Sequence, residues 1–72
     1  MQELIIVTEF IELQNALKLL NYISTGGESK WFIQENDCLI NGTKETRRGR
    51  KLFDGDILEI QNKKYLIKHE TS

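Results

Sequence analysis

The spacing of apolar residues changes along the chain. Residues 3–8 (ELIIVT) form a short apolar run rich in β-branched side chains, which predicts a strand at the edge of a sheet. Residues 12–23 then repeat apolar side chains at steps of three and four, which places them on one face of a helix: Leu13, Ala16, Leu17, Leu20 and Ile23. We expect Gly26 or Gly27 to end this helix, because glycine readily adopts the left-handed conformation found there.

A second, shorter helix is predicted over residues 28–36 (ESKWFIQEN), and the period beyond it becomes that of strands. The pair Asn41-Gly42 stands between two extended segments, which is the strongest short-range signal for a hairpin. Residues 53–56 (FDGD) and 61–63 (QNK) mark two further turns. The chain therefore reads β-α-α-β-β-β-β. Helices segregated from a small antiparallel sheet predict an α+β fold.

The length of 72 residues predicts a single domain, residues 1–72, with a thin core and little room for a deep catalytic pocket. Cys38 and His69 are the single cysteine and the single histidine, which is too few for a zinc site of four protein ligands. One cysteine cannot form an internal disulfide, and this favours a reducing compartment. Neither a membrane-length apolar run nor a signal-peptide pattern is present. We expect a cytoplasmic protein that needs no cofactor.

Residues 44–51 (KETRRGRK) carry a formal charge of +4 in a chain whose net charge is −1. Half of the ten cations lie in this octet: Lys44, Arg47, Arg48, Arg50 and Lys51. The forked guanidinium of arginine matches phosphate oxygens two at a time, and lysine adds a point charge. Gly49 would allow unusual backbone angles and the close approach of a ligand. The octet by itself leaves nucleic-acid binding and a passive solvated loop equally open.

The start of the second helix is a further candidate for anion binding. A helix N-terminus offers free backbone N–H groups, and Lys30 adds a charge beside Ser29. The alternative for Ser29 is that it only caps the helix. Trp31 could stack on a base, although an aromatic residue in a small domain more often belongs to the core. The remaining aromatic residues considered are expected to pack inside: Tyr22, Phe32, Phe53 and Tyr65.

Catalysis finds little support in the sequence. His69 lies three residues from the end, where chains commonly fray. Asp54 and Asp56 flank Gly55 in a turn, where aspartate side chains usually bond to nearby backbone. No phosphate-cradling glycine-rich loop has the required spacing. We therefore expect a protein without enzymatic activity.

The order of motifs resembles the S-four RNA-binding domain, or αL motif, and most of all the small stand-alone bacterial proteins of that group. The strings that carry the resemblance are STGGESKWFI at 24–33, Asn41-Gly42, ETRRGRKL at 45–52 and Gly55-Asp56. Together they cover about residues 9–61. One departure is Glu12-Leu13-Gln14, which stands where the wider family often has Arg-Leu-Asp and implies a narrower RNA footprint at that end of the first helix.

The resemblance implies that structured RNA, often ribosomal or transfer RNA, binds to the face formed by the second helix and the following loop. Carried over by position, the phosphate contacts would come from Lys30, Arg47, Arg48, Arg50 and Lys51, with Lys44 and Ser29 beside them. The turn residues Asn41, Gly42, Gly55 and Asp56 would be structural.

Two functions follow as hypotheses. The first is a monomeric, non-enzymatic RNA-binding module that acts alone or within a ribosomal particle and binds neither a membrane nor a small-molecule substrate. The alternative is a β-grasp-like carrier or protein-interaction domain, since such folds share the Asn-Gly hairpin. The sequence ends in residues 69–72 (HETS) and lacks the reactive Gly-Gly of such carriers. This leaves an acidic protein as the alternative partner of the basic octet.

Overall fold

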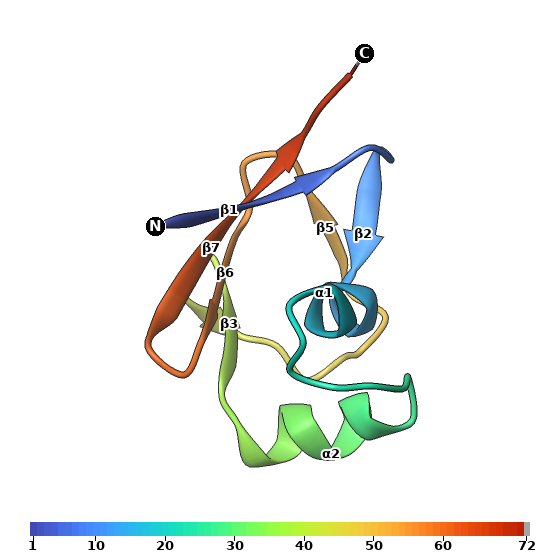
Figure 1. Ribbon diagram of the computed structural model, residues 1–72. Coiled ribbons are helices and arrows are strands. Elements are labelled where there is room, and N and C mark those ends of the chain that lie inside the picture. Colours follow the sequence, from blue (N-terminus) through green and yellow to red (C-terminus); the bar gives the residue numbers. More distant parts are fainter. Residues whose placement is uncertain (72) are drawn as a thin grey trace.

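The computed structural model describes residues 1–71. Two helices lie on the same side of a five-stranded sheet, next to a second sheet of two strands (Figure 1). The elements are β1 Gln2–Ile6, β2 Phe10–Glu12, α1 Leu13–Leu19, α2 Glu28–Glu35, β3 Cys38–Ile40, β4 Thr43–Lys44, β5 Lys51–Phe53, β6 Ile57–Ile60 and β7 Lys63–His69. The predicted α+β class is confirmed. Within the described residues, no helix has the length and apolar character needed to cross a membrane.

The large sheet has the strand order β1-β7-β6-β3-β4. β1 forms one edge, as predicted, but it runs parallel to β7, with Gln2 opposite Tyr65 and Ile6 opposite His69. The other pairings in this sheet are antiparallel. The sheet is therefore mixed, and the prediction of a purely antiparallel sheet is wrong. Parallel neighbours need a long connection, and here the whole helical part of the chain lies between β1 and β7.

Two hairpins close as the turn residues predict. Asn41 and Gly42 join β3 to β4 with φ angles of 53° and 84°. Gln61 and Asn62 join β6 to β7 with φ angles of 51° and 66°. Positive φ at both central residues gives the turn that suits the right-handed twist of the flanking strands.

The small sheet was not predicted. β2 and β5 pair antiparallel, with Phe10 opposite Phe53 and Glu12 opposite Lys51. Each strand has three residues, which is too few to establish an alternating pattern, and the two are distant in sequence. The turn at residues 53–56 therefore leads from the small sheet into β6 of the large sheet and does not close a hairpin.

Helix α1 is shorter than the predicted span of 12–23. The N–H of Tyr22 donates to the carbonyl of Leu17, and the N–H of Asn21 donates to the carbonyl of Lys18, both at 3.0 Å. This pair of bonds forms a Schellman motif, in which Asn21 takes the left-handed conformation with a φ of 66°. The residue that ends the helix is thus Asn21, and the prediction of Gly26 or Gly27 is wrong. Helix α2 agrees with its predicted span to within one residue.

The core lies between the helices and the inner face of the large sheet. Alternate residues of each long strand point inward, as in Leu58 and Ile60 of β6, while their neighbours face outward. Core side chains come from both sheets and from the helical region: Leu4, Ile6, Leu13, Ala16, Leu17, Ile23, Ile33, Cys38, Ile40, Leu52, Leu58, Ile60, Tyr65 and Ile67. The predicted helical face is confirmed at Leu13, Ala16 and Leu17.

The aromatic residues divide between the core and the surface. Tyr22 packs against Phe32 and lies edge-on to Tyr65, and the two tyrosine hydroxyls are 2.6 Å apart. Phe53 instead lies exposed on the small sheet, with its ring centroid 5.8 Å from that of Phe10. The prediction that Phe53 packs inside is therefore wrong.

Candidate nucleic-acid interface

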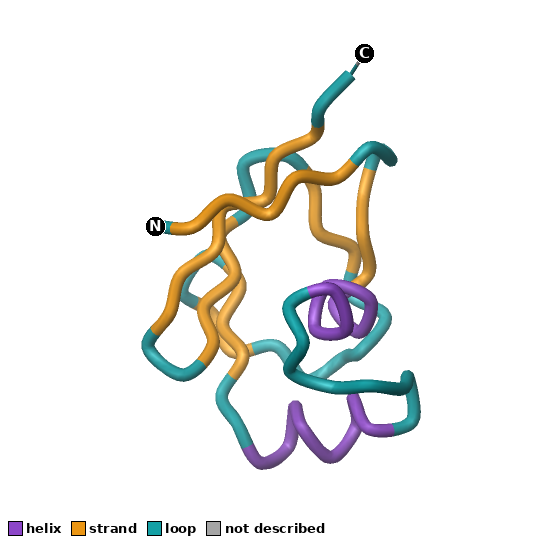
Figure 2. The backbone as a smooth tube through the Cα atoms, in the orientation of Figure 1, coloured by secondary structure: helices purple, strands orange, loops and turns teal. Residues whose placement is uncertain are grey.

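The basic loop, residues 44–51, connects β4 to β5 and passes between α1 and α2 (Figure 2). Its backbone caps the N-terminus of α1. The carbonyl of Arg50 accepts the N–H of Leu13 at 2.8 Å, and the carbonyl of Arg48 accepts the N–H of Gln14 at 2.9 Å. The first N–H groups of a helix have no partner within the helix, and Glu12 provides no side-chain cap here. The loop supplies the missing acceptors and is thereby fixed to α1.

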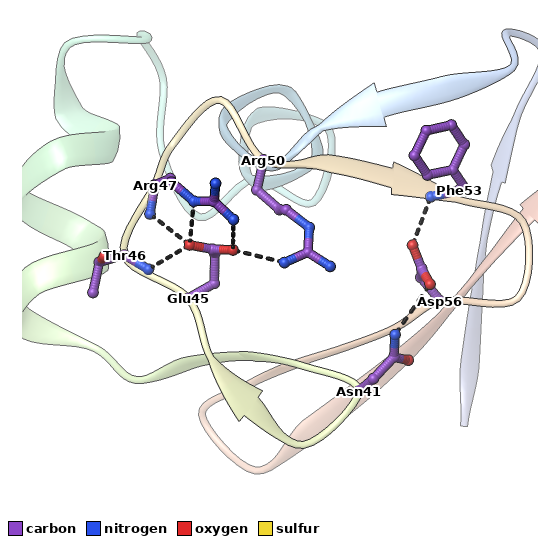
Figure 3. Close-up of polar contacts among 7 residues, drawn as sticks. All are labelled: Asn41, Glu45, Thr46, Arg47, Arg50, Phe53 and Asp56. Atoms are coloured by element: carbon purple, nitrogen blue, oxygen red, sulfur yellow. Dashed lines mark hydrogen bonds and ion pairs between the residues drawn. The ribbon is translucent and has the colours of Figure 1, made fainter.

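A buried carboxylate holds the loop together from inside. Glu45 is 7% exposed and accepts the backbone N–H groups of Thr46 and Arg47, both at 3.0 Å. It also accepts Nε and Nη2 of Arg47, both at 3.1 Å, and Nη1 of Arg50 at 2.8 Å (Figure 3). The hydrogen bonds from Arg47 are the main reason that the pKa of Glu45 falls to about 2, although burial opposes the shift. The carboxylate in turn raises the pKa of Arg47.

The three predicted arginines differ in how they are held. The side chain of Arg47 is 72% exposed, so it faces solvent while bonded to Glu45, and that of Arg50 is half as exposed. Arg48 is exposed, and its side chain has no hydrogen bond or ion pair within residues 1–71. Two arginines are thus oriented by the fold, and the third extends freely from a fixed backbone.

The two lysines at the ends of the loop also have partners. Nζ of Lys44 lies 3.1 Å from a carboxylate oxygen of Asp37. Nζ of Lys51 lies 4.8 Å from the centre of the Phe10 ring, in a cation–π contact. Both lysines remain exposed. A bound anion could therefore still reach either ammonium group.

Gly49 does not have the role expected of it. Its φ is not among the positive values of the described residues, and a Cβ added there would meet no atom within 4 Å. A residue with a side chain could therefore adopt the backbone conformation of Gly49, and the prediction of unusual backbone angles is wrong.

The start of α2 brings Lys30, but not Ser29, to the surface. Ser29 is fully buried, and both its hydroxyl and its N–H donate to the carbonyl of Gly26. Ser29 thus fixes the turn before the helix and does not cap it, because the N-cap residue is Gly27. Lys30 is exposed, and no partner of its side chain is found in the described part of the chain.

Trp31, one residue further, is 63% exposed. The expectation that this tryptophan belongs to the core is wrong. The inner face of α2 is instead filled by the buried Ser29 and Ile33, with Phe32 half-buried against Tyr22.

The turn residues of the resemblance are structural, as expected. Asn41 donates through Nδ2 to a carboxylate oxygen of Asp56 at 3.1 Å, and Asp56 also accepts the N–H of Phe53 at 2.8 Å (Figure 3). Asp54 accepts the N–H of His69 at 2.8 Å. These carboxylates bond to nearby groups of the fold. Within residues 1–71, no group of three or more acidic, histidine or cysteine side chains is arranged to hold a metal ion.

Glu45 is the residue of the candidate interface that the sequence reasoning missed. The signal was available, because a single acid lies in a run of cations, two residues before Arg47 and five before Arg50. The net charge of the octet conceals it. Counting the acid as one lost positive charge gives no indication that it is the buried centre of the loop.

Comparison with known proteins identifies the family. A model described as "S4 domain" matches residues 4–68, from β1 to β7, and includes both helices and the basic loop. The chain belongs to the S4 domain family. This membership confirms the resemblance to the S-four domain and gives no support to the β-grasp alternative.

The S4 domain described here has a curated relative in Bacillus subtilis (strain 168), named "Probable ribosome maturation protein RlbA". The two are 48% identical over 54 residues, which cover 75% of this chain and 76% of the relative. The similarity therefore extends over most of both proteins and is not confined to one motif.

Proposed function

We propose that this S4 domain is a non-enzymatic RNA-binding module that recognises structured RNA, such as ribosomal or transfer RNA, during ribosome assembly or translation. Family membership supports RNA as the ligand. The name of the Bacillus relative, which refers to ribosome maturation, supports the process.

The observation that carries the proposal is the network around Glu45. Arginine has five N–H donors. Glu45 takes Nε and one Nη2 hydrogen of Arg47 and one Nη1 hydrogen of Arg50, so each guanidinium keeps donors for a phosphate. Because the carboxylate and the capping of α1 already hold the loop, binding would cost less conformational entropy than ordering a free loop.

The contacts that we propose are to the phosphate backbone. Arg47, Arg48 and Arg50 would bind phosphates directly, and Lys30, Lys44 and Lys51 would add charge at the sides. Such contacts read the shape of the RNA and not its base sequence. With three to five phosphates neutralised, the logarithm of the association constant should fall with the logarithm of salt concentration at a slope of about −2 to −4.

The test is a pair of matched charge reversals. Lys30→Glu/Arg48→Glu changes two exposed side chains that have no recorded partner in residues 1–71, so the Glu45 network stays intact. The control, Lys63→Glu/Lys64→Glu, makes the same change in charge at the exposed start of β7, where neither lysine side chain has a hydrogen bond or ion pair within residues 1–71.

Binding of a structured RNA should be measured across a salt series with wild type and both variants. We expect the first variant to lose most of its affinity and to show a shallower salt slope, while the control stays close to wild type. Equal losses in both variants, or a wild-type slope near zero, would contradict the proposed interface. Crosslinking in cells, followed by sequencing of the recovered RNA and with the same variants, would identify the target.

A further inference from the structure

The outer face of α2 carries an exposed strip formed by Lys30, Trp31 and Gln34. Residues three and four apart are neighbours on a helix surface, so Gln34 lies beside both Trp31 and Lys30. Ser29 and Ile33 are buried on the opposite side of the same helix. The strip is thus a surface with one large aromatic ring, one cation and one amide.

The fold does not use the ring of Trp31. Other aromatic side chains in the described residues have an aromatic neighbour, Phe10 with Phe53 and Tyr22 with Phe32 and Tyr65. Trp31 has no such neighbour recorded in residues 1–71, and it is 63% exposed. A side chain of this size that remains in water leaves a flat apolar face available to a ligand.

We infer that Trp31 stacks on an unpaired base of the RNA whose phosphates the basic loop binds. This inference rests on the proposed function. Helix α2 lies beside the basic loop in two different views, so one RNA can contact both (Figures 1 and 3). Lys30 would hold the phosphate next to the stacked base, and the amide of Gln34 can bond to a base edge.

The inference narrows the class of RNA. Bases within an A-form duplex are stacked on each other and cannot lie on a side chain. A ligand that uses Trp31 must therefore offer a loop, a bulge or a single-stranded end beside a paired region. Phosphate contacts alone would not distinguish an RNA with unpaired bases from a continuous duplex.

Trp31 is the single tryptophan of the chain, so its fluorescence reports on this position directly when excitation avoids the tyrosines. The probes are a stem-loop RNA and a blunt-ended duplex with the same number of nucleotides. We expect the stem-loop to quench the emission of Trp31 and the duplex to leave it nearly unchanged.

The matching variant is Trp31→Ala. Because Trp31 is exposed, the variant should fold and melt like wild type, which circular dichroism can check. It should bind the stem-loop about fivefold or more weakly, as expected for the loss of one base–aromatic stack, and bind the duplex as wild type does. Trp31→Phe should restore part of the affinity for the stem-loop.

The outcomes separate this inference from the proposed function. If the charge reversal at Lys30 and Arg48 weakens binding but Trp31→Ala does not, and the emission is not quenched, the stacking inference is wrong and the proposed interface stands. Equal weakening on both RNAs would also overturn stacking on an unpaired base. Failure of wild type to bind either RNA would overturn both the stacking inference and the proposed function. The search for a partner that contacts Trp31 would then turn to proteins.

Discussion

Replacing Glu45 by glutamine tests whether one buried carboxylate organises the basic loop. Glu45→Gln keeps the size of the side chain and removes its charge. The bonds from the backbone N–H groups of Thr46 and Arg47, both 3.0 Å long, come from donors that the chain itself holds in place. A hydrogen bond to a charged acceptor contributes about 1.5 kcal/mol or more, and glutamine retains a weaker acceptor. The ion pair with Arg47 adds little, because that side chain is largely exposed.

We therefore expect Glu45→Gln to lower the free energy of unfolding by about 2 kcal/mol near neutral pH. A domain of this length has a total stability of about 4–10 kcal/mol, so the variant should remain folded but melt clearly earlier. Urea unfolding followed by far-ultraviolet circular dichroism measures the difference. Trp31 is too exposed to serve as the probe.

The dependence on pH makes the test specific. The pKa of Glu45 is lowered from 4.5 to about 2 in the folded protein. A lowered pKa means that the carboxylate stabilises the fold fully above about pH 5 and loses this effect as the pH falls toward 2. The gap in stability between wild type and Glu45→Gln should thus close over this range, because glutamine does not titrate.

Glu9→Gln is the control, since Glu9 is exposed and has no recorded hydrogen bond or ion pair within residues 1–71. It should change stability little at any pH. The reasoning would be refuted by a Glu45→Gln variant as stable as wild type near neutral pH, or by a gap that stays constant as the pH falls.

Three further predictions concern the end of α1 and two buried side chains. Asn21→Ala should destabilise the protein by about 1 kcal/mol, because alanine has a Cβ and cannot form the local hydrogen bonds that help asparagine to adopt a left-handed φ. Asn21→Gly should not destabilise the protein. Thermal melting of both variants tests this difference. The pKa of Tyr22 is raised to about 12, first by burial and then by its bond to Tyr65. Ultraviolet titration should therefore show a tyrosine that ionises at unusually high pH, and the stability of the fold should decrease above about pH 10. Tyr22→Phe should remove both effects. Burial raises the pKa of Cys38 to about 11, so a thiol reagent should modify the native protein far more slowly than the unfolded protein.

The features that the sequence predicted well depend on residues close together in the chain. The hairpin turn at Asn41 and Gly42 needs positive φ at two adjacent positions, and few residue pairs adopt it easily. The face formed by Leu13, Ala16 and Leu17 follows from helical spacing and is buried as expected. The cations of the octet were identified by composition alone.

The errors come from contacts between distant segments. The small sheet pairs Phe10 with Phe53, and no local pattern in two three-residue strands reveals that pairing. Trp31 was assigned to the core because aromatic residues of small domains usually lie there, but Ser29 and Ile33 already fill the inner face of α2. Asn21 ends α1 through two backbone bonds, although glycine residues further on gave the stronger sequence signal.

The sequence by itself determined the α+β class, the two hairpin turns, the two helical segments and the presence of a dense basic loop, because each depends on the spacing or conformation of neighbouring residues. The tertiary structure alone decided that Glu45 is buried beneath the arginines, that the loop caps the N-terminus of α1 and that β1 runs parallel to β7. Hydrogen bonds and burial depend on which segments meet in space, and a chain of this length offers many pairings with similar local preferences. The charge of the basic loop can thus be read from eight consecutive residues, whereas the shape of the candidate interface requires the whole domain.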